Sequence, residues 1–182
     1  VIAFGGRAMK PDAPAKYLNS PETTLFSKGR ILYNHDKARG PAHERGRIIA
    51  VEGYMDVIAI TRAGFPEVVA PLGTALTEDQ LALLWKAAAE PILCFDGDSA
   101  GLKAAYRALD LALPLLTPGH SLSFALLPEG QDPDDLLKSE GSDAVKSVLE
   151  QAQPLSEVLW QRALSDNDRA TPERKAQFER DL

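Results

Sequence analysis

The sequence is poor in cysteine: Cys94 is the only one in 182 residues. A single cysteine excludes an intrachain disulfide and a cysteine zinc site, and it is compatible with a reducing compartment. Because apolar residues flank Cys94, we interpret it as a buried strand residue and not as a nucleophile. The chain also lacks an initial methionine. We therefore expect it to be a piece of a longer protein.

The chain lacks the long apolar segments that membranes require. No apolar run reaches the roughly 18 residues of a membrane-spanning helix, and residues 1–7 lack the basic start and apolar body of a signal peptide. We therefore expect no membrane association and a cytoplasmic location.

Positive charge is also scarce overall, since 20 Lys and Arg face 26 Asp and Glu, a net charge of −6. An acidic chain argues against nucleic-acid binding, which usually needs a basic surface. The distribution weakens this objection, because residues 7–47 hold nine basic and four acidic side chains. Nucleic-acid binding therefore remains open for this basic segment.

The middle of the chain alternates short apolar runs with amphipathic segments. The preceding residues are irregular, with one helix expected from Ile31 to Ala38, ended by Gly40 and Pro41. Thr77 is a good N-cap for one of the later helices. Strands are expected at 47–51, 67–70, 92–95 and 122–127, and helices at 54–62, 78–90 and 100–113. This order predicts an α/β fold, Rossmann-like, with a mostly parallel sheet covered by helices.

After residue 132 the pattern predicts helices only, at 133–138, 142–151, 155–164 and from 172 onward. We therefore expect three parts: a basic, loop-rich segment (1–46), an α/β domain (47–131) and a helical appendage (132–182). Trp85 and Trp160 lie on apolar helical faces, so both are expected in the core.

Acidic residues follow three of the expected strands. Functional groups of α/β sheets gather where strands end and helices begin. Gly53 and Gly97 leave room beside the acids there. The acids are Glu52 and Asp56, then Asp96 and Asp98, then Asp132 and Asp134.

Crowded carboxylates repel one another unless their pKa values rise or a cation binds between them. Oxygen ligands without His or Cys favour Mg²⁺ over zinc. An EF-hand loop starting at Asp96 fails, because Ala100 and Arg107 occupy ligand positions. A phosphatase with two aspartates after a strand would leave Glu52 without a role. A purely structural use also exists for single acids, since Asp98 or Asp134 could simply cap a helix.

The strings around these acids resemble the Toprim domain, which bacterial primases, type IA and II topoisomerases and some nucleases and recombination proteins share. They resemble the DnaG-type primase in particular, over about residues 1–150. The strings are 4–7 (FGGR), 16–23 (KYLNSPET), 26–30 (FSKGR), 51–57 (VEGYMDV), 95–98 (FDGD) with Gly101, and 127–134 (LPEGQDPD).

This resemblance implies a DNA-dependent RNA polymerase that makes short RNA primers on single-stranded DNA during replication. It implies catalytic roles for Glu52, Asp96 and Asp98. It also implies a Mg²⁺ site, open to Mn²⁺, formed by these three with Asp56, Asp132 and Asp134. The implied nucleotide- and DNA-binding residues are Arg7, Lys16, Tyr17, Asn19 and Lys28.

The partners implied are single-stranded template, ribonucleoside triphosphates and the RNA primer–DNA hybrid. A replicative helicase would bind through a missing C-terminal domain, and zinc would belong to a missing N-terminal domain. Because part of the core before Val1 also lacks a counterpart here, we expect this chain alone to prime weakly or not at all.

Two other classes stay open at this point. One is another Toprim enzyme, a topoisomerase or nuclease fragment; a topoisomerase would need a nucleophilic tyrosine in a separate domain. The other is a noncatalytic DNA-binding module, which would have little use for six acids. For the basic residues, the alternative is a solvated surface charge, and Tyr17 could be a half-buried anchor.

Overall fold

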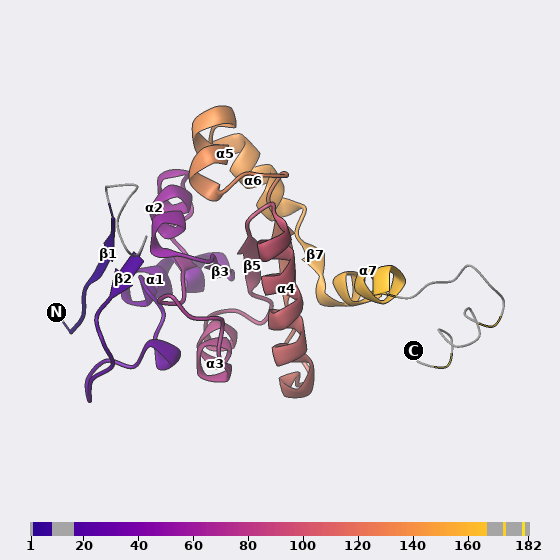
Figure 1. Ribbon diagram of the computed structural model, residues 1–182, viewed down its shortest axis with the longest axis horizontal. Coiled ribbons are helices and arrows are strands. Elements are labelled where there is room, and N and C mark those ends of the chain that lie inside the picture. Colours follow the sequence, from indigo (N-terminus) through magenta and orange to yellow (C-terminus); the bar gives the residue numbers. More distant parts are fainter. Residues whose placement is uncertain (1, 9–16, 167–172, 174–179, 181–182) are drawn as a thin grey trace.

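The computed structural model describes residues 2–8, 17–166, 173 and 180. Its centre is a five-stranded sheet in the order β4-β3-β5-β6-β7, with helices on both faces (Figure 1). The elements are β1 (Gly5–Arg7), β2 (Tyr17–Asn19), the 3-10 helix η1 (Lys28–Arg30), α1 (His35–Arg45), β3 (Ile49–Ala50), α2 (Tyr54–Arg62), β4 (Val68–Val69), α3 (Glu78–Ala87), β5 (Ile92–Phe95), α4 (Ser99–Ala112), the 3-10 helix η2 (Leu113–Leu115), β6 (Ser123–Leu126), α5 (Pro133–Glu140), α6 (Ser142–Glu150), β7 (Gln153–Pro154) and α7 (Leu155–Asp166). The predicted α/β class is confirmed.

The sheet is parallel except at one side. β3 pairs in parallel with β4 and β5, and β5 pairs in parallel with β6. β7 runs antiparallel to β6. Strands covered on both faces must be apolar throughout, which explains the continuous apolar runs in the sequence.

Alternation along the strands sends side chains into two cores. Ile49 and Cys94 face the core under α2, α5 and α6. Ala50 and Leu93 face the core under α1, α3, α4 and α7. This is the two-residue period of a strand buried on both sides. Figure 1 shows α2, α5 and α6 grouped at the top of the molecule, with α3 at the opposite end.

The connections leave β3 and β5 in opposite directions. From β3 the chain runs through α2 to β4, which pairs with the edge of β3 that faces away from β5. From β5 it runs through α4 to β6, which pairs with the edge of β5 that faces away from β3. In open α/β sheets, ligands bind outside the carboxyl ends of two such strands. The order of the strands therefore points to the carboxyl ends of β3 and β5.

Several predicted elements are confirmed. α2 spans Tyr54–Arg62 as expected, and the Thr77 hydroxyl accepts a hydrogen bond from the amide of Gln80 at the start of α3. α3 ends at Ala87, earlier than expected. In the described part of the chain, no helix combines the length and the apolar character needed to cross a membrane.

The prediction for the first helix was wrong. α1 runs from His35 to Arg45 through Pro41 and ends at Gly46, which has a φ of 63°. Ala38 and Ala42 are fully buried on its inner face. Packing of this face outweighs the hydrogen bond that Pro41 cannot donate.

The prediction of helices only after residue 132 was wrong as well. β7 pairs with β6 before α7 begins, and Leu155 and Val158 of α7 join the core. Trp160 is 44% exposed and so is not a core residue, whereas Trp85 packs against the core and stacks on His120. The helix expected from 172 onward lies outside the described residues.

Candidate active site

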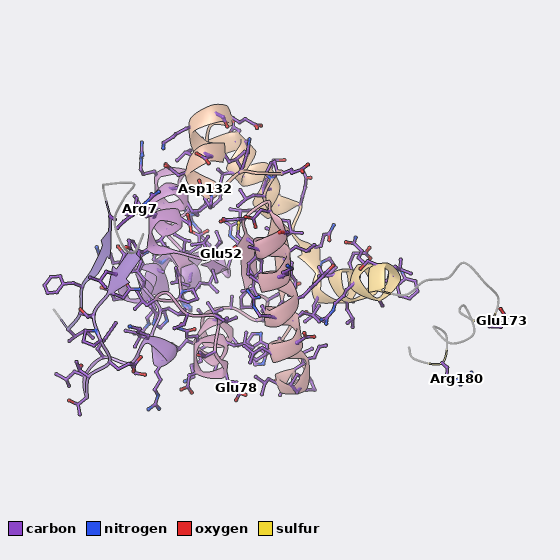
Figure 2. All side chains as sticks on the ribbon, in the orientation of Figure 1. Arg7, Glu52, Glu78, Asp132, Glu173 and Arg180 are labelled. Carbon is purple, nitrogen blue, oxygen red and sulfur yellow. The ribbon has the colours of Figure 1, made fainter. Side chains whose placement is uncertain are left out.

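The carboxylates that follow three strands lie at one end of the sheet. Glu52 follows β3, Asp96 and Asp98 follow β5, and Asp132 follows β6. Figure 2 shows Glu52, Asp132 and Arg7 in the same part of the view, and the charges of all three act on Asp56. The sheet order brings these segments together, because β3, β5 and β6 are consecutive parallel neighbours.

One hydrogen bond joins the segments that follow β3 and β5. The main-chain amide of Asp96 donates to Oε1 of Glu52 at 3.1 Å. The bond orients the Glu52 carboxylate toward the acids after β5. The bond thus ties the Glu52 carboxylate to the backbone of the segment that carries Asp96 and Asp98.

Asp96 carries the clearest electrostatic sign of a shared site. The pKa of Asp96 is raised to about 7. Partial burial is the largest cause, and the negative charges of Glu52, Asp56, Asp132 and Asp98 act in the same direction. A carboxyl group is therefore poised to exchange a proton near neutral pH. Perturbed acids of this kind gather at functional sites.

The pKa of Asp56 is affected by some of the same acids. Burial raises the pKa of Asp56 to about 6, opposed by a hydrogen bond from the Gly53 amide. The charges of Asp132 and Glu52 raise this pKa, whereas the nearby charge of Arg7 lowers it. Asp56 is thus close enough to the other acids and to Arg7 of β1 for all of their charges to affect its pKa.

Two of the predicted ligands also cap helices. Oδ1 of Asp98 accepts hydrogen bonds from the amides of Ala100 and Gly101, at 2.8 and 2.7 Å. Oδ1 of Asp132 accepts from the amide of Asp135 at 2.8 Å. The capping alternative therefore describes part of what both residues do. Because these bonds use one of two carboxylate oxygens, capping is compatible with a second contact.

Asp134 is placed differently from the other acids. It forms an ion pair with Lys138, one turn along α5. It is not among the charges that raise the pKa of Asp56 or Asp96. The structure thus brings together Glu52, Asp56, Asp96, Asp98 and Asp132, and sets Asp134 apart.

The carboxylates do not form a ready-made cage. Among the described residues, no three His, Cys, Asp or Glu side chains stand close enough to hold one metal ion. Mg²⁺ commonly keeps several waters and takes one or two carboxylates together with substrate phosphates. An oxygen-only set with mutual repulsion suits a hard cation held in that manner.

Two glycines allow the strand ends to approach. A Cβ on Gly97 would lie 1.8 Å from the carbonyl oxygen of Pro128, and one on Gly101 would lie 2.2 Å from that of Asp96. The amide of Gly97 donates to the carbonyl of Gln131 at 3.1 Å. The segments after β5 and β6 therefore pack backbone to backbone, which positions Asp96 and Asp132.

The structure describes some of the predicted nucleotide- and DNA-binding residues. Arg7 lies on β1, where it pairs with Tyr17 of β2, and its charge acts on Asp56. The side-chain amide of Asn19 donates to the carbonyl of Leu72 at 3.3 Å, beside the loop after β4. Lys28 lies in η1, and its carbonyl accepts from Gln80 in the first turn of α3. Lys16 and the side chain of Tyr17 lie outside the described residues.

Sequence reasoning missed two residues near the acids. Arg107 of α4 lines a hollow that also includes Glu52. Tyr54, the first residue of α2, packs its ring 5.9 Å from that of Tyr33. The rule that functional groups follow strands could have drawn attention to Tyr54, which comes two residues after Glu52. Arg107 is far from any strand end in sequence, so only the fold reveals it.

Comparison with known proteins defines the class of this fold and site. Residues 46–125 match the Toprim domain, and residues 1–39 match the N-terminal domain of the DNA primase catalytic core. The α/β unit with its carboxylates is therefore a Toprim domain.

Individual relatives are DNA primases. The chain is 48% identical to the DNA primase of Escherichia coli K12 over 178 residues, 98% of this chain and 30% of that protein. It is 46% identical to the DNA primase of Rickettsia felis over all 182 residues, again 30% of that protein. A DnaG primase catalytic domain bound to single-stranded DNA matches with a TM-score of 0.88 and 47% identity, over 98% of this chain and 57% of that one.

The chain thus spans about a third of the length of these curated relatives. It belongs to the bacterial DnaG-type DNA primase family and corresponds to part of the catalytic core.

Proposed function

We propose that this chain forms the Toprim part of a primase that joins ribonucleotides into short RNA primers on single-stranded DNA during replication. The observation that carries the proposal is the hydrogen bond from the Asp96 amide to Glu52. Beside it, burial and the neighbouring carboxylates raise the pKa of Asp96 and of Asp56. Membership of the DNA primase family supports it, because that family supplies both the reaction and the template.

We assign catalytic roles to Glu52, Asp96 and Asp98, with Asp56 and Asp132 beside them. These residues would hold Mg²⁺, for which Mn²⁺ can substitute. When bound, the cation would neutralise triphosphate charge and favour an ionised primer hydroxyl. Asp134 remains a weaker candidate ligand, because Lys138 already neutralises it.

The reaction proposed is attack of a primer 3′-hydroxyl on the α-phosphate of a ribonucleoside triphosphate, with release of pyrophosphate. The Asp96 amide orients the Glu52 carboxylate, which can accept the hydroxyl proton or serve as a ligand. The charge of Arg7 acts on Asp56, so Arg7 can neutralise a phosphate that approaches the acids.

The template and the triphosphate groups of the nucleotides would lie along the basic segment. We propose that Arg7, Asn19 and Lys28 contribute to this surface, with Lys16 and Tyr17 as further candidates. A related DnaG primase catalytic domain is bound to single-stranded DNA in its structure, which supports the choice of template. Contacts of this kind should weaken with salt, because they release counterions.

We propose the same residue ranges for the functional parts: 1–46 for the basic segment, 47–131 for the Toprim domain and 132–182 for the helical part. The RNA–DNA hybrid, a replicative helicase and a zinc-binding domain would engage other parts of the whole primase, in the cytoplasm at the replication fork. The topoisomerase or nuclease alternative is not favoured, since the relatives are DNA primases.

Mn²⁺ binding tests the proposal directly. Isothermal titration of the purified protein should give a Mn²⁺ affinity that falls in Asp96→Asn and Asp98→Asn. Asp143→Asn is the matched control, because Asp143 is an exposed acid in the first turn of α6. Equal Mn²⁺ binding by all four proteins would contradict the proposal.

A further inference from the structure

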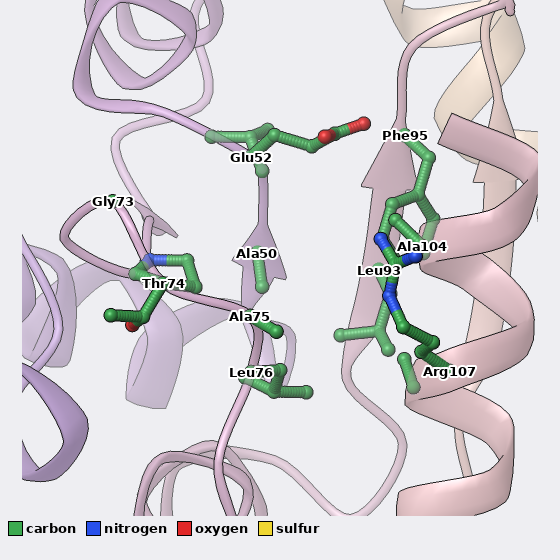
Figure 3. Close-up of a pocket in the computed structure, with 13 residues that line it drawn as sticks. Ala50, Glu52, Gly73, Thr74, Ala75, Leu76, Leu93, Phe95, Ala104 and Arg107 are labelled. Carbon is green, nitrogen blue, oxygen red and sulfur yellow. The ribbon is translucent and has the colours of Figure 1, made fainter. Parts of the chain in front are cut away.

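A hollow of about 320 Å³ lies on the α4 side of the sheet, next to the acids. Its walls are the ends of β3 and β5, the loop after β4 and one face of α4. Figure 3 shows Ala50 and Leu93 on neighbouring strands, with Leu76 below Ala50 and Ala104 of α4 beside Leu93. The volume lies at the lower end of the roughly 300–1,000 Å³ typical of small-molecule sites.

The hollow lies where open α/β sheets usually bind a ligand, at the carboxyl ends of two strands whose connections diverge. β3 and β5 are the two strands whose connections diverge, and residues of both line it. Crevices at such a point bind nucleotides in other α/β proteins. The hollow therefore shares its mouth with the proposed catalytic site, through Glu52.

Small side chains keep the hollow open. Five positions of its lining are glycine or alanine on the loop and strand side or on α4: Ala50, Gly73, Ala75, Ala104 and Ala108. A leucine at any of the alanines would occupy part of the space. The remaining walls include Leu76, Leu93 and Phe95, so the interior is apolar and suits a flat aromatic ring.

Two charged groups border this apolar interior. Figure 3 shows the carboxylate of Glu52 pointing across the top of the hollow toward Phe95, and the guanidinium of Arg107 rising from α4 beside Phe95 and Ala104. A carboxylate accepts hydrogen bonds from ribose hydroxyls, and a guanidinium donates to acceptor atoms on a base edge.

We infer that this hollow binds the base and ribose of a ribonucleoside triphosphate whose phosphates face Asp96 and Asp98. Arg107 contacts the base and fixes its orientation, and Ala104 leaves the space that the base occupies. The inference rests on the proposed function, because the acids then hold the phosphate end through a cation. It adds a nucleoside subsite, with Arg107 as a positioning residue, to the acids already assigned.

The test compares GTP with inorganic tripolyphosphate, each titrated into the purified protein in the presence of Mn²⁺. Ala104→Leu fills the hollow with a residue that suits a helix as well as alanine does. Ala82→Leu is the control, an exposed alanine of α3 that does not line the hollow. Arg107→Gln is paired with Lys103→Gln, which changes an exposed residue of the same helix.

Ala104→Leu and Arg107→Gln should each weaken GTP binding by about tenfold or more. Both should leave tripolyphosphate and Mn²⁺ binding unchanged, as should the two controls. A merely structural role for these residues would instead alter all three ligands together. Thermal unfolding of each variant confirms that the fold persists, and Arg107→Gln keeps the test decisive if the larger leucine disturbs α4.

The outcomes separate the inference from the proposed function. If native protein binds Mn²⁺ and GTP, but neither variant weakens GTP relative to tripolyphosphate, the subsite is overturned and the catalytic assignment stands. If native protein binds no Mn²⁺, the proposed function fails and the subsite fails with it.

Discussion

Glu52 and Asp96 meet through a hydrogen bond of 3.1 Å, donated by the Asp96 amide to the Glu52 carboxylate. The bond joins the residues that follow two adjacent parallel strands, at the point where the chain leaves those strands in opposite directions. The side chain of Asp96 is partly buried beside four other acids, and burial together with their charges raises its pKa to about 7. This arrangement leads to the first prediction.

Stability should fall as pH rises from about 4 to about 7 in metal-free protein. The pKa of Asp96 is raised from 3.8 to about 7 in the fold, so in that interval the folded protein binds more protons than the unfolded chain. The free energy of unfolding then decreases with pH. Asp56, with a pKa raised to about 6, contributes in the same direction.

Thermal unfolding between pH 4 and pH 7 measures this effect. Asp96→Asn should flatten the dependence, because the amide does not titrate. The pKa of His35 is lowered by burial and by Arg39, which acts in the opposite direction, so the difference between the native protein and the variant is the informative quantity. A difference that stays constant with pH would show that Asp96 titrates normally.

Asp98 should separate capping from metal binding. Asp98→Asn keeps an oxygen that can accept from the Ala100 and Gly101 amides, so it should retain stability while losing Mn²⁺ affinity. Asp98→Ala should lose the affinity and also about 1 kcal/mol of stability, the usual value of an N-cap. Chemical denaturation and Mn²⁺ titration of both variants make the comparison. Full Mn²⁺ affinity in Asp98→Asn would leave Asp98 as a cap alone.

Asp132 and Asp134 should differ as ligands although they are two residues apart. Asp132 acts on the pKa of both Asp56 and Asp96, whereas Asp134 is paired with Lys138. Asp132→Asn should therefore weaken Mn²⁺ binding by about tenfold or more, and Asp134→Asn should change it much less. Titration of the two variants side by side decides, and the reverse order would reassign the site.

Gly97 should tolerate no side chain. A Cβ there would lie 1.8 Å from the backbone of Pro128, so Gly97→Ala must push the segments after β5 and β6 apart. We expect a loss of about 1–3 kcal/mol of stability and weaker Mn²⁺ binding.

Gly40 provides the matched control for Gly97, since it lies within α1 and a Cβ there meets nothing within 4 Å. Gly40→Ala should change stability by less than about 1 kcal/mol, because the better helix propensity of alanine is opposed by crowding against the ring of Pro41, the next residue. Urea unfolding of both variants tests the pair. Equal effects would mean that space at Gly97 is not limiting.

Glu67 should matter for stability and not for binding. Its fully buried carboxylate accepts from Arg45 at 2.8 Å and from Arg47 at 2.6 and 3.1 Å. Breaking a buried pair costs about 3–5 kcal/mol. Both guanidiniums remain partly in water, so Glu67→Gln should cost the lower end of that interval. Urea unfolding measures the loss, and Mn²⁺ affinity should stay native.

Much of the site was predictable from one rule, that acids following parallel strands meet at their carboxyl ends. The rule worked for Glu52 and Asp96 because short apolar runs identify buried strands, and because β3 and β5, the strands before these two acids, are neighbours in the sheet. The rule could not show that Asp134 forms an ion pair with Lys138, although a spacing of four residues is a common pairing pattern in helices.

Elements whose form depends on distant partners escaped prediction. Gln153 and Pro154 form a strand without any apolar pattern, because β6 offers them hydrogen-bonding groups. α1 continues through Pro41 because Ala38 and Ala42 are buried against the sheet. Arg107 reaches the hollow only because α4 crosses beside β5. In each case the deciding contact lies many residues away in sequence.

The pairing of β7 with β6 has a practical consequence for shortened versions of this protein. Phe124 pairs with Gln153, and the Leu155 amide donates to the carbonyl of Leu122. In a protein truncated after residue 150, β6 would become an edge strand with unpaired amides and carbonyls. Such an edge can pair with a strand of another molecule and lead to aggregation. Shortened proteins made for crystallography should therefore retain α7 through Val158, whose side chain is buried in the core.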